Sequence, residues 1–247
     1  MQEPKNQPSL KRRFKSFVRS CVPANMALPI VGGSLKGMKW VIKSSDFSCF
    51  MGRYEVHVQD AIRAHVRSGE TAYDIGANVG FHTLLCAKVV GAGGRVMAFE
   101  PFPRNVGILK RHLRMNAIDN VTVVEAAISE SNGQVWFSAP ADLHGSMGHI
   151  AEHESSGTIC VNTLALDGSG FPAPSFIKMD VEGHELLALQ GMRNILLTSR
   201  PVLVIERSPA SFGEVEKFLA QAGYQSNLLL GDASSRSGDW LSLPLGK

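Results

Sequence analysis

The chain has 247 residues, of which 44% are hydrophobic and 19% charged. This composition excludes a chain that is disordered throughout and a coiled coil, and it fits one large domain. The formal net charge of +3 hides an asymmetry. Residues 1–20 hold six Lys/Arg against one Glu, a net charge of +5, whereas the rest holds 19 Lys/Arg and 21 Asp/Glu, a net charge of −2. The charge of the body therefore argues against a nucleic-acid-binding surface.

Residues 1–35 are predicted to form a basic, flexible arm, because they combine the charged run with Pro and Gly. Phe14, Phe17 and Val18 interleave with the bases, a pattern that would suit phosphate or an anionic membrane surface. Pro23 and Pro29 break the apolar stretch that follows, so the start of the chain does not fit a secretory signal. No apolar run approaches the roughly 18 residues of a membrane-spanning helix.

The four cysteines lie far apart, and no Cys-x-x-Cys pair occurs. In a chain of this length they predict buried free thiols in a reducing compartment, so we expect the protein in the cytoplasm. The residues are Cys21, Cys49, Cys86 and Cys160.

Residues 36–70 are predicted to form a hairpin and a helix that pack on the core. Residues 38–43 and 47–54 read as two short strands. Over 55–67, Val58, Ile62 and Val66 recur at helical spacing.

From residue 71 onward, short apolar runs alternate with amphipathic stretches, which predicts a parallel sheet covered by helices on both faces. The expected strands are 71–75, 95–99, 121–124, 176–179 and 201–205, and the expected helices are 80–90, 103–115, 183–190 and 211–221. The fold class is therefore α/β, with a doubly wound, mostly parallel sheet, and residues 71–247 form the main domain.

The alternation is interrupted between Glu125 and Phe176, where no long helix is predicted. Residues 134–137 and 158–161 read as strands, and residues 139–157 between them are rich in Gly, Ser and His. Because long loops in compact domains are often functional, we expect 139–157 to be a lid or an acceptor-binding insert.

An acid stands at or just after the end of each of five predicted strands. Ligands of open parallel sheets bind beyond the carboxyl ends of the strands, so these acids indicate a site for hydroxyls, ammonium groups or a metal ion. The five are Asp74, Glu100, Glu125, Asp180 and Glu206.

The first strand–helix turn, residues 74–80, reads Asp-Ile-Gly-Ala-Asn-Val-Gly. It has neither the Gly-x-Gly-x-x-Gly spacing of a dinucleotide site nor a P-loop, and an acid at Asp74 does not suit a phosphate cradle. Glu100 ends the second strand, where nucleoside-binding α/β folds place a carboxylate that accepts both ribose hydroxyls. A ligand with a ribose, no phosphate and an ammonium for Asp74 corresponds to S-adenosylmethionine.

Residues 71–206 resemble the FkbM-type methyltransferases, a branch of the class I, Rossmann-like enzymes. The resemblance rests on residues 74–80, on Phe-Glu-Pro-Phe-Pro at 99–103, on Ile-Lys-Met-Asp-Val-Glu-Gly-His-Glu at 177–185, and on shorter matches at 113, 116, 126–129, 166–167, 191 and 201–206. It implies a seven-stranded, Rossmann-like sheet with a final antiparallel pair at 222–243. It also implies transfer of a methyl group from S-adenosylmethionine to a hydroxyl of a small molecule or glycan.

The resemblance also assigns expected roles to residues. The cofactor site is expected to comprise Asp74, Gly76, Ala77, Asn78, Gly80, Glu100, Pro101, Ala126, Ala127 and Asp180. Asp180 and Glu182 are the catalytic candidates, and Glu185 is a supporting acid. Independently of the resemblance, His144 or His149 of the insert is a candidate base that reaches over the acceptor. By analogy with the wider class I O-methyltransferases, Asp180 and Glu206 are candidate ligands of Mg²⁺. His184 is expected to lie on a helix surface.

Other functions are compatible with parts of the pattern. They are a nicotinamide-dependent oxidoreductase, a catalytically silent domain that binds S-adenosylmethionine or a protein partner, and an RNA or protein-associated methyltransferase that uses the basic arm. The glycine spacing and Asp74 oppose the first, the intact carboxylates Asp74, Glu100 and Asp180 oppose the second, and the net charge of the body opposes the third.

Overall fold

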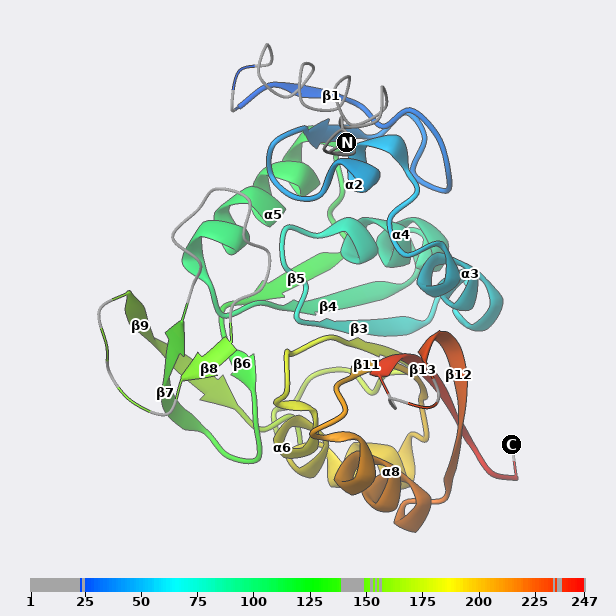
Figure 1. The fold of residues 1–247 in the computed structure, drawn as a ribbon. Helices are drawn as coiled ribbons and strands as arrows, with labels where there is room; N and C mark the ends of the chain where they lie inside the picture. The colour runs from blue at the N-terminus through cyan, green and yellow to red at the C-terminus, as the bar shows by residue number, and fades with distance from the viewer. Residues whose placement is uncertain are drawn as a thin grey trace, which may run out of the picture.

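A computed structural model of the protein describes residues 23, 25–138, 149–151, 153, 155, 157–232, 234 and 237–246. Its centre is a seven-stranded sheet in the order β12-β13-β11-β10-β3-β4-β5 (Figure 1). The strands β5, β4, β3, β10 and β11 are parallel, and β13 runs antiparallel to both β11 and β12. The bounds are β3 Thr71–Ile75, β4 Arg95–Phe99, β5 Val121–Val124, β10 Phe176–Met179, β11 Val202–Arg207, β12 Tyr224–Asp232 and β13 Ser237–Pro244. The predicted doubly wound Rossmann-like fold and its terminal antiparallel pair are confirmed.

Helices cover both faces of this sheet, and alternate residues of each strand enter two separate apolar cores (Figure 1). On β3, for example, Ala72 packs in one core, whereas Tyr73 and Ile75 pack in the other. One face carries α3 Val56–His65, α4 Phe81–Val90 and α5 Pro103–Met115, and the opposite face carries α6 Glu185–Gln190, α7 Arg193–Thr198 and α8 Phe212–Gln221. Burial of the strands on both faces explains their nearly continuous apolar sequences.

The segment before the main sheet differs from the prediction. A hairpin is present, but it joins β1 Ala27–Pro29 to β2 Lys39–Val41. The strand predicted at 47–54 is wrong, because Phe47–Met51 form the helix α2, whose N-terminus is capped by the Asp46 carboxylate accepting from Ser48 N at 2.7 Å. Ile30 and Leu35 are fully buried in the core, so the last residues of the expected arm are part of the folded domain.

His112 and Asn116 on α5 fasten β2 to the domain. Val41 N donates to His112 Nε2 at 3.0 Å, and His112 Nδ1 lies 2.8 Å from Val79 O, so the imidazole is neutral with its proton on Nδ1. Asn116 bonds both the N–H and the C=O of Lys39. Burial lowers the pKa of His112 to about 4, which agrees with the neutral form.

Between β5 and β10 lies a second, four-stranded sheet in the order β6-β9-β7-β8 (Figure 1). Its strands are β6 Ala127–Ile128, β7 Gly133–Ser138, β8 His149–Ala151 and β9 Thr158–Leu164. The two strands predicted here, at 134–137 and 158–161, are confirmed, and residues 139–148 of the expected insert lie outside the described residues.

The cysteines match the prediction in part. Cys49 and Cys86 are buried free thiols, but Cys160 is exposed, because it lies on the outward face of β9. Cys21 lies outside the described residues. Among the described helices, none has the length and apolar character needed to cross a bilayer.

Candidate functional site

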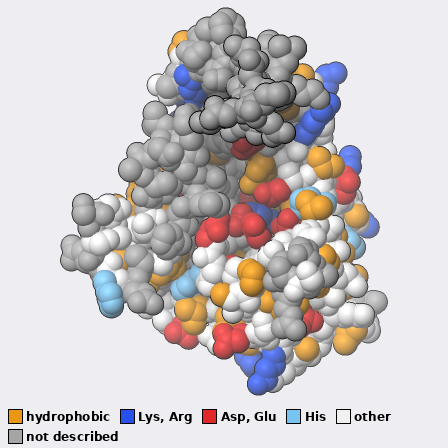
Figure 2. Space-filling model, in the orientation of Figure 1, with side chains coloured by type: hydrophobic (Ala, Val, Ile, Leu, Met, Phe, Trp, Pro, Cys, Tyr) orange, Lys and Arg blue, Asp and Glu red, His pale blue; other side chains and the backbone are white. Residues whose placement is uncertain are grey.

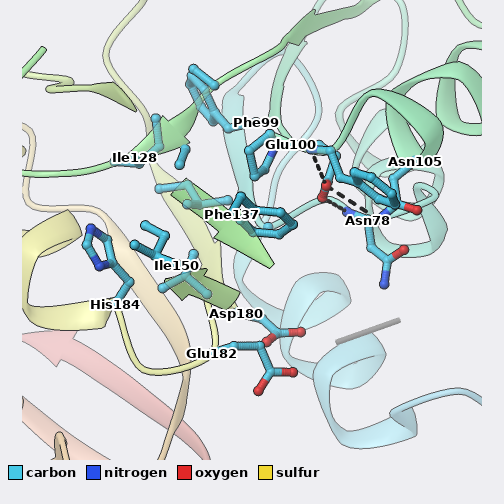
Figure 3. A pocket seen from close by; sticks show the side chains of 17 residues that line it. Asn78, Phe99, Glu100, Asn105, Ile128, Phe137, Ile150, Asp180, Glu182 and His184 are labelled. Atoms are coloured by element: carbon cyan, nitrogen blue, oxygen red, sulfur yellow. Dashed lines mark hydrogen bonds between the residues drawn. The ribbon is translucent and has the colours of Figure 1, made fainter. Parts of the chain in front are cut away.

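A cavity opens where β3, β4 and β10 end, with the small sheet as its far wall. The empty space inside it is about 710 Å³, including the part that is open to solvent. Figure 3 shows Glu100, Asn78 and Asn105 grouped together, with Asp180 and Glu182 in a separate group. The lining residues are Ile75, Gly76, Asn78, Phe99, Glu100, Pro101, Phe102, Asn105, Ala126, Ala127, Ile128, Phe137, Ile150, Asp180, Val181, Glu182 and His184.

Glu100 is held rigidly at the end of β4 and is only 4% exposed. Its carboxylate accepts from Asn78 N at 2.7 Å, from Phe102 N at 2.9 Å and from Asn105 Nδ2 at 3.4 Å (Figure 3). Burial raises the pKa of Glu100 to about 7, although these hydrogen bonds act in the opposite direction. A fixed carboxylate with lone pairs left over can accept hydrogen bonds from ligand hydroxyls. The predictions did not include Asn105, which supports Glu100 from the first turns of α5.

The turn after β3 needs glycine at two positions. Gly76 has a φ of 75°, and a side chain there would overlap the carbonyl oxygen of Asp180. Gly80 has a φ of 95°, and a side chain there would overlap Leu109 of α5. The glycines therefore allow β3, β10 and α5 to approach each other closely around the cavity.

Asp74, the predicted partner of a ligand ammonium, is not among the residues that line this cavity. Its side chain is 1% exposed, accepts from Thr83 Oγ1 at 2.5 Å and lies 4.0 Å from Lys178 Nζ. It lies opposite Lys178 in the pairing of β3 with β10. Asp74 is thus enclosed beneath the turn, because α4 and β10 close over it.

The structure brings most of the other predicted cofactor residues together. Gly76, Asn78, Glu100, Pro101, Ala126, Ala127 and Asp180 all line the cavity. Phe137 of β7 and Ile150 of β8 add apolar wall from the small sheet, and no motif in the sequence pointed to them. Ala77 and Gly80 line a neighbouring cavity instead.

This second cavity, of about 420 Å³, adjoins the first and shares Gly76, Asn78 and Asp180 with it. Its remaining walls come from the segment before β3, the start of α4, and β10. They are Ser45, Asp46, Cys49, Tyr54, Ala77, Val79, Gly80, Phe81, His82 and Lys178. The two cavities therefore adjoin at the turn after β3.

Lys178 lies at the centre of a group of acids that the predictions overlooked. Its ammonium is 3.3 Å from Asp180 Oδ2, and Glu55 and Glu206 also act on it electrostatically. Burial acts to lower the pKa of Lys178, but these carboxylates together with Asp74 raise it above its ordinary value. Figure 2 shows acidic side chains gathered around a basic one in the central hollow of the molecule. Lys178 is the one charged residue in the apolar run 176–179, and this could have indicated that buried acids surround it.

The residues do not fit the expected Mg²⁺ site. Burial, followed by the negative charge of Asp180, raises the pKa of Glu206. The ammonium of Lys178 already neutralises Asp180. Within the described ranges, no group of three or more His, Cys, Asp or Glu side chains is arranged to hold a metal ion. The expectation of Mg²⁺ is therefore not supported.

Of the candidate catalytic residues, Asp180 and Glu182 line the first cavity. Glu182 is exposed and has a φ of 50°, a left-handed conformation that is uncommon for a residue with a side chain. His144 lies outside the described residues, and Glu185 is buried and accepts from Gly183 N at 2.7 Å. His184 was expected on a helix surface, but it lines the cavity and lies 3.0 Å from Ser129 Oγ.

Comparison with known proteins gives the same family as the sequence motifs. The family described as "Methyltransferase FkbM domain" matches residues 74–226, more than half of the chain. The chain belongs to the FkbM methyltransferase family. It is therefore an S-adenosylmethionine-dependent methyltransferase, and the alternative of a nicotinamide-dependent oxidoreductase is wrong.

Individual relatives agree with this family. The hexuronic acid methyltransferase AglP of Haloferax volcanii is 32% identical over 169 residues, which are 66% of this chain and 68% of that protein. A crystal structure of the methyltransferase FkbM from Methylobacillus flagellatus has a TM-score of 0.52 at 22% identity; the match covers 80% of this chain and about half, 53%, of that one. A putative rRNA methylase from Clostridium thermocellum, with a TM-score of 0.51 at 17% identity over 76% of this chain and 92% of that chain, shares the fold.

Proposed function

We propose that this protein transfers a methyl group from S-adenosylmethionine to a hydroxyl oxygen of a small molecule or glycan, with a sugar as the preferred class of acceptor. The name of the relative from Haloferax volcanii, a hexuronic acid methyltransferase, supports a sugar. The observation that carries the cofactor assignment is the buried Glu100 carboxylate, which two backbone N–H groups fix at the cavity wall.

The residues present fit the parts of S-adenosylmethionine. Glu100 would accept hydrogen bonds from the ribose hydroxyls, and Phe102, Ala126, Phe137 and Ile150 offer an apolar slot for the base. The second cavity, at the start of α4, would receive the amino acid end. The cofactor supplies a methyl group on a positively charged sulfur, which is already activated for transfer.

The acceptor hydroxyl must lose its proton as its oxygen forms the new bond to carbon. Asp180 and Glu182 are the proposed proton acceptors, because both line the first cavity and Asp180 lies where the two cavities meet. The proton moves to a carboxylate oxygen of one of these residues, and solvent can take it up from the exposed Glu182. His144 remains a proposed base from the insert.

A cofactor titration tests the assignment. Glu100→Ala should weaken S-adenosylmethionine binding at least tenfold in isothermal calorimetry, because the ribose loses a charge-assisted hydrogen bond worth about 1.5–3 kcal/mol. The matched control is Glu125→Ala, which removes an exposed strand-end acid paired with Lys110. Wild-type affinity in Glu100→Ala would refute the proposed site.

The acceptor class is tested separately with isotopically labelled S-adenosylmethionine. Neutral sugars, uronic acids and cell-extract metabolites are incubated with the protein, and labelled products are identified by mass spectrometry. We expect the label on a sugar hydroxyl as an ether. A product labelled on nitrogen or on a nucleic acid would contradict this part of the proposal.

The proposed location is the cytoplasm. Cys49 and Cys86 are free and buried, and burial raises the pKa of Cys49 to about 12, so this thiol is unreactive. Such thiols are compatible with a reducing compartment.

A further inference from the structure

Lys178 places a permanent positive charge beneath the point where the two cavities join. The side chain is 5% exposed, and its ammonium lies 3.3 Å from Asp180 Oδ2 and 4.0 Å from Asp74 Oδ1. Asp74 lies on β3, and Asp180 directly follows the neighbouring strand β10. In the pairing of these two strands, Lys178 lies opposite Asp74. Two acids on adjacent strands therefore share one lysine as their counter-ion.

Acids from four segments surround the ammonium of Lys178, and His82 of α4, whose pKa is lowered by burial and by Lys178, faces it as well. Asp74 comes from β3, Asp180 follows β10, Glu206 lies on β11, and Glu55 comes from the segment before α3. A lysine in this setting stays protonated and cannot act as a base. Its available roles are to hold carboxylates in place and to neutralise them.

A divalent cation at the same acids would conflict with this arrangement. Mg²⁺ needs oxygen ligands at about 2.0–2.1 Å, so an ion on Asp180 would lie close to the ammonium and be repelled by it.

We propose that Lys178 is the resident cation of this active site, so that the protein positions Asp180 and methylates its acceptor without a divalent metal ion. This inference rests on the proposed function. Lys178 acts through Asp180 and is a positioning residue: its ammonium, 3.3 Å from Oδ2, holds the Asp180 carboxylate at the wall of both cavities.

The first test uses the wild-type protein. Mn²⁺ is titrated as the probe and followed by electron paramagnetic resonance, while cofactor binding is measured by calorimetry on the same sample with and without EDTA. We expect no bound Mn²⁺ at millimolar concentration and a cofactor affinity that EDTA leaves unchanged. One tightly bound Mn²⁺ that disappears in Asp180→Asn would overturn the proposal. Failure to bind the cofactor would instead refute the proposed function. The Mn²⁺ titration would then still show whether Asp180 binds a divalent metal ion.

The second test compares Lys178→Met with Lys178→Arg, with Lys88→Met as the control because Lys88 is an exposed lysine on α4. We expect Lys178→Met to lower kcat at least tenfold and to move the acid limb of the pH–rate profile upward by at least one pH unit. Lys178→Arg should retain more activity than Lys178→Met, and Lys88→Met should match the wild type. A Lys178→Met variant with unchanged kcat and pH profile would overturn the role of Lys178. If both Lys178 variants fail to fold, the wild-type Mn²⁺ titration still decides whether the site binds a divalent metal ion.

Discussion

Glu100 illustrates how one side chain can link cofactor binding to pH. Its pKa in the free protein is about 7, because burial disfavours the charged carboxylate. The ionised form can accept from two ribose hydroxyls, whereas the protonated form must use one oxygen as a donor.

Cofactor affinity should therefore rise as the pH increases from 6 to 8. In Glu100→Gln, which has the same shape but does not titrate, this rise should be lost or strongly reduced. Calorimetric titrations across this range measure both proteins. Parallel pH profiles for the two would show that Glu100 does not bind the ribose.

His112 makes a residue-level contribution to stability that is lost as the pH falls. It is fully buried, stacks on Trp40 with ring centroids 3.9 Å apart and makes two hydrogen bonds in its neutral form. Its folded pKa of about 4 lies below the ordinary value of 6.5, so the unfolded chain binds the proton more tightly. The stabilising contribution is fully present above pH 6.5 and is lost as the pH falls towards 4.

His112→Leu should lower the free energy of unfolding by about 2–4 kcal/mol at pH 7, because two buried partners lose their hydrogen bonds. At pH 5 the difference from the wild type should narrow by about 2 kcal/mol. Urea denaturation at both pH values measures this. A difference that stays constant would mean that His112 is not neutral through burial.

At the scale of elements, the turn after β3 depends on the close approach of α5. Gly80 has a φ of 95°, and a side chain there would overlap Leu109, so neither the backbone nor the packing tolerates a larger residue. Gly107 lies on the same helix, α5, but a side chain there would meet only open space, so it offers a control outside this contact.

Gly80→Ala should destabilise the protein by about 1–3 kcal/mol, through backbone strain and overpacking. Gly107→Ala should stabilise it by about 0.5–1 kcal/mol, because alanine loses less entropy in a helix. Chemical denaturation of the two variants gives the comparison. Equal effects would contradict the close contact between the turn and α5.

At the same scale, local patterns predicted some elements and missed others for identifiable reasons. The strands at 71–75 and 95–99 were predictable because they are buried on both faces, and α5 was predictable because its apolar residues recur on one side. Phe47–Met51 was read as a strand because its run is apolar, although Asp46 two residues before Ser48 was a visible helix cap. The helix α7 was not predicted, because its N-terminus carries no local cap. The carboxylate of Asp167, 27 residues before Asn194, accepts from Asn194 N and Ile195 N instead.

At the scale of the whole molecule, the sequence predicted where the cavity lies better than it predicted which charged side chains contact each other beside it. Glu100 and Asp180 were found because parallel strands end on one side of a sheet. The surroundings of Lys178 were not, because Glu55, Asp180 and Glu206 come together only through folding of three distant segments. The same reason explains Asp74, which looked like a ligand contact but is enclosed by Thr83 and Lys178.

The cavity wall also has a consequence for dynamics, because its residues come from two separate sheets. Glu100 and Asp180 belong to the main sheet, whereas Phe137 and Ile150 belong to the small one. A bound adenosyl group would bridge them, so opening of β7 and β8 would require release of the ligand. Amide hydrogens of Val135 and Phe137 should then exchange with deuterium more slowly when S-adenosylhomocysteine is present, while those of β12, at the far edge of the main sheet, keep their rates.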